Sequence, residues 1–249
     1  MVLMNAGILA SGRASAFLDI WRIHELRGIS EVNDRIRIGG TTTFTEIAAS
    51  TLVQRAAPAL VAAARTIGAI QIQNRATLGG NIVNGSPAGD SLPVLAACDA
   101  EVEIGSARGT RMVPFNDFYT GYRKTVLAPD ELLVSVLLPK RRDDEEWSFR
   151  KVGTRRAQAI SKVVMAARLR LDGGLIREAG IGLGSVAPTV IRVRETERLL
   201  LGRRPDQKLI GEAREMLMRE VTPITDLRST SHYRRTVAGN LLARLLSSL

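Results

Sequence analysis

Residues 76–95, ATLGGNIVNGSPAGDSLPVL, are the most informative stretch of this 249-residue sequence. The first fifteen of them hold four glycines, two asparagines and one proline around a single apolar pair, Ile82–Val83. This composition is typical of tight turns and of close backbone approach to a ligand, because glycine has no Cβ. The apolar residues that follow predict a helical turn or two over 91–97.

Within this stretch, Thr77–Leu78–Gly79–Gly80–Asn81 has two interpretations. Consecutive glycines let backbone N–H groups converge on an anion, and the Thr hydroxyl and Asn amide add hydrogen bonds. Taken alone, a Gly–Gly–Asn is more often explained by a plain tight turn. The segment is neither a P-loop, since no Lys–Ser/Thr follows, nor a G-x-G-x-x-G dinucleotide fingerprint. A second glycine cluster, 180–184 (GIGLG), lies inside a predicted strand and indicates close packing.

The charge of the chain is uneven. Lys and Arg number 35 against 25 Asp and Glu, giving a net charge of +10, and residues 140–249 hold 23 basic and 13 acidic groups. The whole excess therefore lies in the C-terminal part. A nucleic-acid partner is disfavoured because there is no Lys-rich tail and aromatic residues make up only 4% of the chain. An arginine-rich surface that docks a protein partner is the better interpretation.

The residue inventory also limits the chemistry. One cysteine, Cys98, cannot form an intrachain disulfide, which fits a reducing cytoplasm. With it and two distant histidines, His24 and His232, the chain offers no ligand set for zinc or an iron–sulfur cluster. Its apolar runs are shorter than the roughly 20 residues that cross a bilayer. We therefore expect a cytoplasmic protein with no membrane span, no bound metal and no acid–base catalytic residue of its own.

Hydrophobic periodicity divides the chain in two at the charged run 140–146 (KRRDDEE). Before the run, we expect a helix that Thr43 and Glu46 cap and an amphipathic helix over 51–67. The strands expected there are 35–39, 100–104, 111–113 and 131–139. After the run, we expect strands 149–152, 162–171 and 176–183, a hairpin turn at 172–174, and helices 190–201, 205–220 and 231–246. The pattern predicts an α+β protein with domains 1–141 and 146–249.

The stretch 76–95 closely resembles the second flavin-binding segment of the FAD subunits of molybdenum hydroxylases, the family of xanthine dehydrogenase and aerobic carbon monoxide dehydrogenase. The resemblance continues in order along nearly the whole chain. It includes LDIWRIHELRGI (18–29), RIGGTTTFTEI (37–47), FYTGYRKTVLAPDELLVSVLLP (118–139), FRKVGTRRAQAISKVVMAARLRL (149–171) and HYRRTVAGNLLARLL (232–246). The fold that it implies is a vanillyl-alcohol-oxidase-type (PCMH) FAD-binding domain, followed by a smaller domain of antiparallel sheet and helices.

The resemblance also implies which residues bind the cofactor. Thr77, Gly79, Gly80 and Asn81 would contact the diphosphate and ribityl region of FAD, and Asp90 a hydroxyl. Leu133 would pack near the flavin and Lys151 would lie at the ring edge, where a cation stabilises the anionic reduced form. Two simpler interpretations stay open. Asp90 is also placed to cap the helix 91–97, and Lys151 to be a surface lysine at the domain seam.

By the same resemblance, the chain would be an oxidoreductase subunit that passes electrons from 2Fe–2S clusters to FAD and on to NAD, a quinone or another acceptor. The clusters would lie on a small subunit and a molybdopterin cofactor on a large one, in a dimer of heterotrimers. Family members also carry an earlier loop of the type Ala-Gly-Gly-Thr, whereas this sequence opens at MVLMNAG. We therefore expect an N-terminally incomplete flavin domain, and the alternative is a truncated, flavin-free scaffold subunit.

Overall fold

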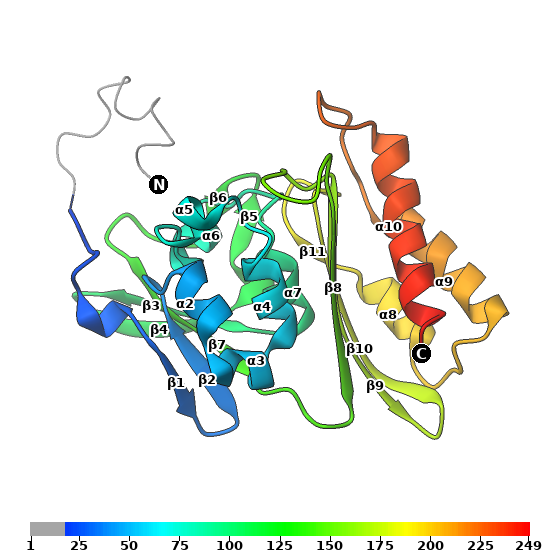
Figure 1. Cartoon of the computed structure of the whole chain (residues 1–249), viewed down its shortest axis with the longest axis horizontal. Helices are drawn as coiled ribbons and strands as arrows, with labels where there is room; N and C mark the ends of the chain where they lie inside the picture. Colours follow the sequence, from blue (N-terminus) through cyan, green and yellow to red (C-terminus); the bar gives the residue numbers. More distant parts are fainter. Residues whose placement is uncertain (1–17) are drawn as a thin grey trace.

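The computed structural model describes residues 18–249, so the prediction of an incomplete N-terminus, which concerns Met1–Gly7, lies outside the described residues. The described chain forms two regions, each with one main antiparallel sheet (Figure 1). The strands are β1 (Ile29–Val32), β2 (Arg35–Gly39), β3 (Glu101–Ser106), β4 (Gly109–Pro114), β5 (Tyr119–Gly121), β6 (Lys124–Thr125), β7 (Leu132–Pro139), β8 (Glu145–Val152), β9 (Val163–Asp172), β10 (Leu175–Gly184) and β11 (Ile191–Arg192). The α-helices are α2 (Phe44–Ala49), α3 (Thr51–Ala56), α4 (Pro58–Ala64), α5 (Ile70–Gln73), α6 (Leu78–Val83), α7 (Leu92–Ala97), α8 (Arg194–Leu200), α9 (Gln207–Glu220) and α10 (Ser231–Leu246).

The first region is built on a five-stranded sheet in the order β1-β2-β7-β3-β4. The central strand β7 pairs with β2 through Ile38↔Val136 and with β3 through Val102↔Val136, so the three strands share one row of buried side chains. Helices α2, α3, α4, α6 and α7 contribute buried side chains to the core beside this sheet, and the more exposed α5 packs against α2. The remaining strands, β5 and β6, form a small separate pair.

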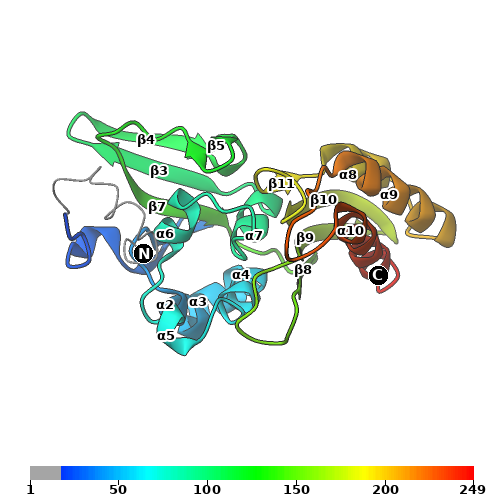
Figure 2. The same ribbon diagram turned by 90° about the horizontal axis from the view of Figure 1, so that it is seen from above.

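The second region is a four-stranded sheet in the order β11-β10-β9-β8, with helices α8, α9 and α10 on one face (Figure 2). Alternation along β9 separates two cores, because successive side chains of a strand point to opposite faces. Met165, Ala167 and Leu169 face the helices α8–α10, whereas Ala166 joins the core of the first region. The sheet therefore stands between the two groups of helices.

Helix α7 of the first region lies directly on β10, across a face of that strand without side chains. A Cβ added to Gly180 would lie 2.0 Å from the Ala97 carbonyl oxygen, and one added to Gly182 would lie 2.2 Å from that of Pro93. The cluster at 180–184 thus serves helix–strand packing, as the sequence predicts.

Several local predictions are confirmed. Thr43 and Glu46 form a reciprocal capping box at the start of α2. Gly173 and Gly174, at φ of 58° and 73°, form the two-residue turn between β9 and β10. The α+β arrangement of antiparallel sheets and helices is confirmed as well.

Three local predictions need correction. The helix expected over 190–201 begins only at Arg194, because residues 191–192 form the edge strand β11. The single helix expected over 51–67 is wrong, because the chain breaks at Ala57 (φ −148°) and Pro58 starts a new helix at a position where no N–H donor is required. Strand β8 also begins earlier than expected, at Glu145, and so uses part of the charged run. Glu145 is only 1% exposed and pairs with Arg168 of β9 at 2.7 Å, which makes that end of the run part of the sheet.

Candidate functional site

The glycine-rich segment folds as the first turn of helix α6. Thr77 is its N-cap, and the Thr77 hydroxyl oxygen accepts the N–H of Gly80 at 3.0 Å. The N–H groups of Leu78 and Gly79 donate to carbonyl oxygens of the chain between β2 and α2, at 3.0 and 2.9 Å. The donors that were expected to converge on an anion are therefore hydrogen-bonded within the chain, and the segment is a capped helix start instead of an open anion loop.

The first glycine of the pair has a packing role. A Cβ on Gly79 would lie 2.6 Å from the Gly40 carbonyl oxygen, and a Cβ on Gly40 would lie 2.5 Å from that of Leu133. Only glycines allow these three backbone segments to stack at such distances. The structure thus brings the start of α6, the end of β2 and the buried Leu133 of β7 into one layer.

Asn81 connects this layer to the chain before α7. Its Oδ1 accepts the Ser91 hydroxyl at 2.7 Å, which turns the amide nitrogen the other way. Within residues 18–249 that nitrogen has no hydrogen-bond partner, and Asn81 is half-buried. The Asn81 amide and the half-buried Gly80 are therefore accessible to a ligand.

Asp90 and Lys151 form a buried ion pair at the seam between the two regions. The Lys151 Nζ lies 2.5 Å from Asp90 Oδ2 and donates to the Thr66 carbonyl oxygen at 2.8 Å, and the two side chains are 10% and 8% exposed. Asp90 also accepts the hydroxyl of the buried Ser161. Burial raises the pKa of Asp90, and Lys151 and Ser161 oppose that shift in pKa.

The ion-pair geometry tests the simpler interpretations of Asp90 as a helix cap and of Lys151 as a surface lysine. The N-cap position of α7 is Ser91 and no side chain caps it, so Asp90 is not a helix cap. Lys151 is at the seam, as one interpretation held, but it is buried. An ammonium has three N–H donors and, within residues 18–249, two of them are engaged here, so one is left for a further acceptor.

The ion pair continues into a polar network that sequence patterns do not reveal. Ser185 donates its hydroxyl to the Ser161 carbonyl oxygen at 2.9 Å, although it is a buried residue with φ +64°. Arg234 of α10, 4% exposed, donates to the Ser185 carbonyl oxygen at 3.0 Å and to Asp226 at 2.7 Å. Of these network residues, the sequence marks only Arg234, because it lies within the segment 232–246 that carries the family resemblance.

A groove of about 510 Å³ lies over this network. Ser161, Ser185 and Arg234 line it from the second region, together with Pro87 and Tyr122 from the first. Ser161 therefore connects the floor of this groove to the buried Asp90–Lys151 pair.

The residue types at the site suit a polar, oxygen-rich organic group more than a metal. They offer an amide donor, one free ammonium donor and a carboxylate beside a layer in which added side chains would clash. Among residues 18–249, no group of three or more His, Cys, Asp or Glu is placed to hold a metal ion. In the same part of the chain, no helix combines the length and apolarity needed to cross a bilayer.

Comparison with known protein families covers both regions. The family described as the FAD binding domain in molybdopterin dehydrogenase matches residues 3–141. The chain belongs to this family. The CO dehydrogenase flavoprotein C-terminal domain matches residues 147–249. The predicted family and fold class are confirmed, the cofactor of the family is FAD, and the chain is an oxidoreductase subunit.

Individual relatives agree with this assignment. The chain is 36% identical over 232 residues to the xanthine dehydrogenase FAD-binding subunit of Escherichia coli O157:H7, which is 92% of this chain and 80% of the relative. It is 30% identical over 231 residues to the carbon monoxide dehydrogenase medium chain of Hydrogenophaga pseudoflava, which is 93% of this chain and 80% of that one.

Solved structures are similar over the same extent. A structure of carbon monoxide dehydrogenase from Hydrogenophaga pseudoflava superimposes with a TM-score of 0.88 and 31% identity, covering 91% of this chain and 78% of that chain. A Cu,Mo-CO dehydrogenase structure gives a TM-score of 0.90 at 27% identity, covering 97% of this chain and 85% of that chain.

Proposed function

We propose that this chain binds FAD against the start of α6 and the Asp90–Lys151 pair and serves as the electron-transfer subunit of a molybdenum-containing hydroxylase. Electrons would arrive from 2Fe–2S clusters on a small subunit and leave to NAD, a quinone or another acceptor. Substrate hydroxylation would take place at the molybdopterin cofactor of a large subunit. When bound, FAD supplies the ability to accept electrons singly and release them in pairs.

Each candidate residue at the start of α6 has a separate role in this proposal. Thr77 holds the turn of α6 in shape, and Gly79 lets it stack on Gly40, which in turn lies against Leu133, so that a flat ligand meets a dense backbone layer. Gly80 leaves room for the diphosphate, and the Asn81 amide donates to it. These contacts position the cofactor, and none of them moves a proton.

The observation that carries the proposal is the buried Asp90–Lys151 pair, at the seam of a chain whose family binds FAD. Lys151 uses its remaining N–H to hold the ring edge, and Asp90 both fixes the Lys151 ammonium and accepts a cofactor hydroxyl. Because Asp90 neutralises most of the field of the ammonium, the pair stabilises added negative charge on the ring less than a lone lysine does.

The domain boundaries and the subunit assembly that we propose are those implied by the family. Residues 1–141 form the flavin domain and residues 146–249 the second domain. The assembly is a dimer of heterotrimers located in the cytoplasm, and nucleic acid is not a partner. The relative from Hydrogenophaga pseudoflava is named a medium chain, which supports a place for this chain beside larger and smaller subunits.

Reconstitution with FAD tests the binding site. The purified full chain should gain flavin absorbance, and Gly80→Val should abolish it, because the new side chain occupies the place of the diphosphate. Gly211→Val is the matched control, since nothing lies within 4 Å of a Cβ added to that helical glycine. A folded wild-type chain that never retains flavin would favour the flavin-free scaffold. Normal flavin content in Gly80→Val would show that the site is elsewhere.

A pair of substitutions tests the role of Lys151. Lys151→Met removes the cation and should lower the midpoint potential of bound FAD, whereas Asp90→Asn leaves the ammonium without its counterion and should raise it. General damage to the site would move both potentials in one direction. Equal or same-sign shifts would therefore contradict a position of this pair at the ring edge.

A further inference from the structure

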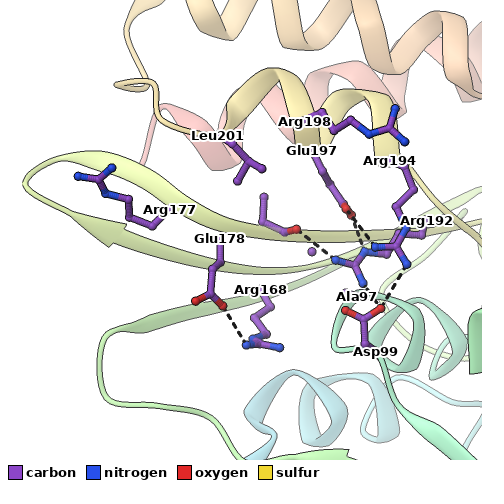
Figure 3. Close-up of a pocket in the computed structure, with 12 residues that line it drawn as sticks. Ala97, Asp99, Arg168, Arg177, Glu178, Arg192, Arg194, Glu197, Arg198 and Leu201 are labelled. Carbon is purple, nitrogen blue, oxygen red and sulfur yellow. Dashed lines mark hydrogen bonds and ion pairs between the residues drawn. The ribbon is translucent and has the colours of Figure 1, made fainter. Parts of the chain in front are cut away.

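A second hollow, of about 570 Å³, lies at the end of α7 that is remote from Asp90. Ala97 and Asp99 line it from the first region, and the remaining residues come from β9, β10, β11, α8 and the C-cap of α8, Leu201, in the second (Figure 3). Five of the lining residues are arginines and three are carboxylates. We refer to this hollow as the arginine pocket.

The floor of the arginine pocket is a closed ionic network. Arg192 is 8% exposed, and its Nε lies 2.6 Å from Glu197. Its other donors reach Asp99 and the carbonyl oxygens of Ala96 and Ala179. Because these donors are engaged inside the protein, Arg192 is held in place and links the two regions. The dashed lines in Figure 3 mark its ion pairs.

The rim of the pocket is different, because its charged side chains are open to solvent. Arg177, Arg194 and Arg198 are 44%, 50% and 67% exposed, and the apolar Leu201 beside them is 46% exposed. Arg177 lies where the register of β10 shifts between Ile176 and Glu178. Among residues 18–249 its only ion pair is a 3.5 Å contact with Asp172. Such irregularities commonly re-aim a side chain.

We propose that the arginine pocket is the docking site for an acidic segment of a partner subunit, one that also carries an aliphatic side chain for Leu201. This inference rests on the proposed function, because it assumes a multisubunit complex. The surplus of arginine over carboxylate selects a negatively charged partner, and the mixed apolar and guanidinium lining is typical of protein interfaces.

The geometry favours a protein segment over a small anion. A small-anion site needs converging donors that are already held in place, but the buried Arg192 has its donors engaged and the three rim arginines are long, exposed side chains. Surface ion pairs such as Arg198–Glu195 are weak and exchange readily for new partners. A segment inserted here contacts both Asp99 and α8, so its binding also fixes the arrangement of the two regions.

Charge reversal at the rim tests this surface. We expect Arg177→Glu/Arg198→Glu to retain the fold and its FAD, but to weaken association with the large and small subunits at least about tenfold at low salt. Lys208→Glu/Arg219→Glu on α9 makes the same change in net charge at exposed positions away from the pocket and should associate like wild type. The wild-type interaction should also weaken as salt rises.

Each outcome of that experiment decides a separate point. If wild type assembles and the Arg177→Glu/Arg198→Glu variant assembles equally well, the docking inference is wrong and the proposed function stands. If wild type binds FAD but does not associate with the other subunits, the complex itself is wrong and the inference fails with it. If tripolyphosphate stabilises wild type but not the variant, while assembly is unchanged, the pocket is a small-anion site instead.

Cross-linking identifies the occupant directly. The photoreactive residue p-benzoylphenylalanine placed at Leu201 in the purified complex should capture a peptide rich in Asp and Glu from one partner subunit. The same probe placed at Leu132 of β7, which is 43% exposed, should not capture that peptide. Capture of a peptide without acidic residues at Leu201, or of no partner, would overturn the inference.

Discussion

Substituting Gly182 by alanine should loosen the packing between the two regions of the molecule and lower its stability. Gly182 lies on β10 opposite Ala166, beneath helix α7. The added Cβ would lie 2.2 Å from the Pro93 carbonyl oxygen and 2.9 Å from its carbon. To restore an ordinary contact, α7 must withdraw by roughly 1 Å from the sheet.

The cost of this withdrawal follows from what α7 covers. All six residues of the helix are buried, so a shift opens gaps on the side away from Gly182. Overpacking of this kind costs about 1–3 kcal/mol. For a chain of this size each kcal/mol lowers Tm by about 2–4 °C, and we therefore expect Gly182→Ala to lower Tm by about 2–12 °C.

Gly211→Ala on α9 provides the matched control. Nothing lies within 4 Å of a Cβ added there, so the same chemical change should stabilise the helix by up to about 1 kcal/mol. Thermal and urea unfolding followed by circular dichroism measure both effects. If Gly182→Ala melts at or above the wild-type temperature, the close packing of α7 on β10 described above is wrong.

Three further expectations concern buried groups. Asp90→Asn should lower the free energy of unfolding by about 3–5 kcal/mol, since it strands the Lys151 ammonium, and urea titration that shows no loss would contradict a buried pair. Burial raises the pKa of Cys98 to about 12, so the native thiol should not react with Ellman's reagent at pH 8 but should react in urea. Burial alone raises the pKa of Glu145, but hydrogen bonds from Trp147 and Arg168 outweigh it and hold that pKa below the usual range. The ionised form of Glu145 therefore stabilises the native state above about pH 4.5, and this stabilisation is lost as the pH falls through the lowered pKa. In Glu145→Gln, the free energy of unfolding from urea titration should fall less steeply than in wild type between about pH 5 and pH 3.

The sequence predicts elements whose determinants are local. The two-residue turn at Gly173–Gly174 and the capping box of Thr43 depend on neighbouring residues, and both are confirmed. The helix expected over 51–67 fails for a related reason. Its apolar spacing continues across Pro58, but a proline that is favourable as the first residue of a helix also ends the helix before it.

The site is harder to predict, because its partners are distant in sequence. Gly79 packs against Gly40, and Asp90 pairs with Lys151, 61 residues further along the chain. No local pattern distinguishes a glycine needed for a ligand from one needed for another backbone segment. Ser185 lies in no motif and Arg234 is marked only by the family resemblance of 232–246, so it is the fold that brings the two residues together at the seam.

The sheet of β8 to β11 belongs to both regions, because each of its faces completes a different hydrophobic core. A fragment that began at β8 would expose Trp147, Phe149 and the glycine face of β10 to water, and a fragment that ended before β8 would uncover α7. Neither half can therefore be exchanged with that of a relative unless the strip of glycines and the helix lying on it change together. Substitutions in the glycine strip of β10 and in α7 are therefore constrained by each other.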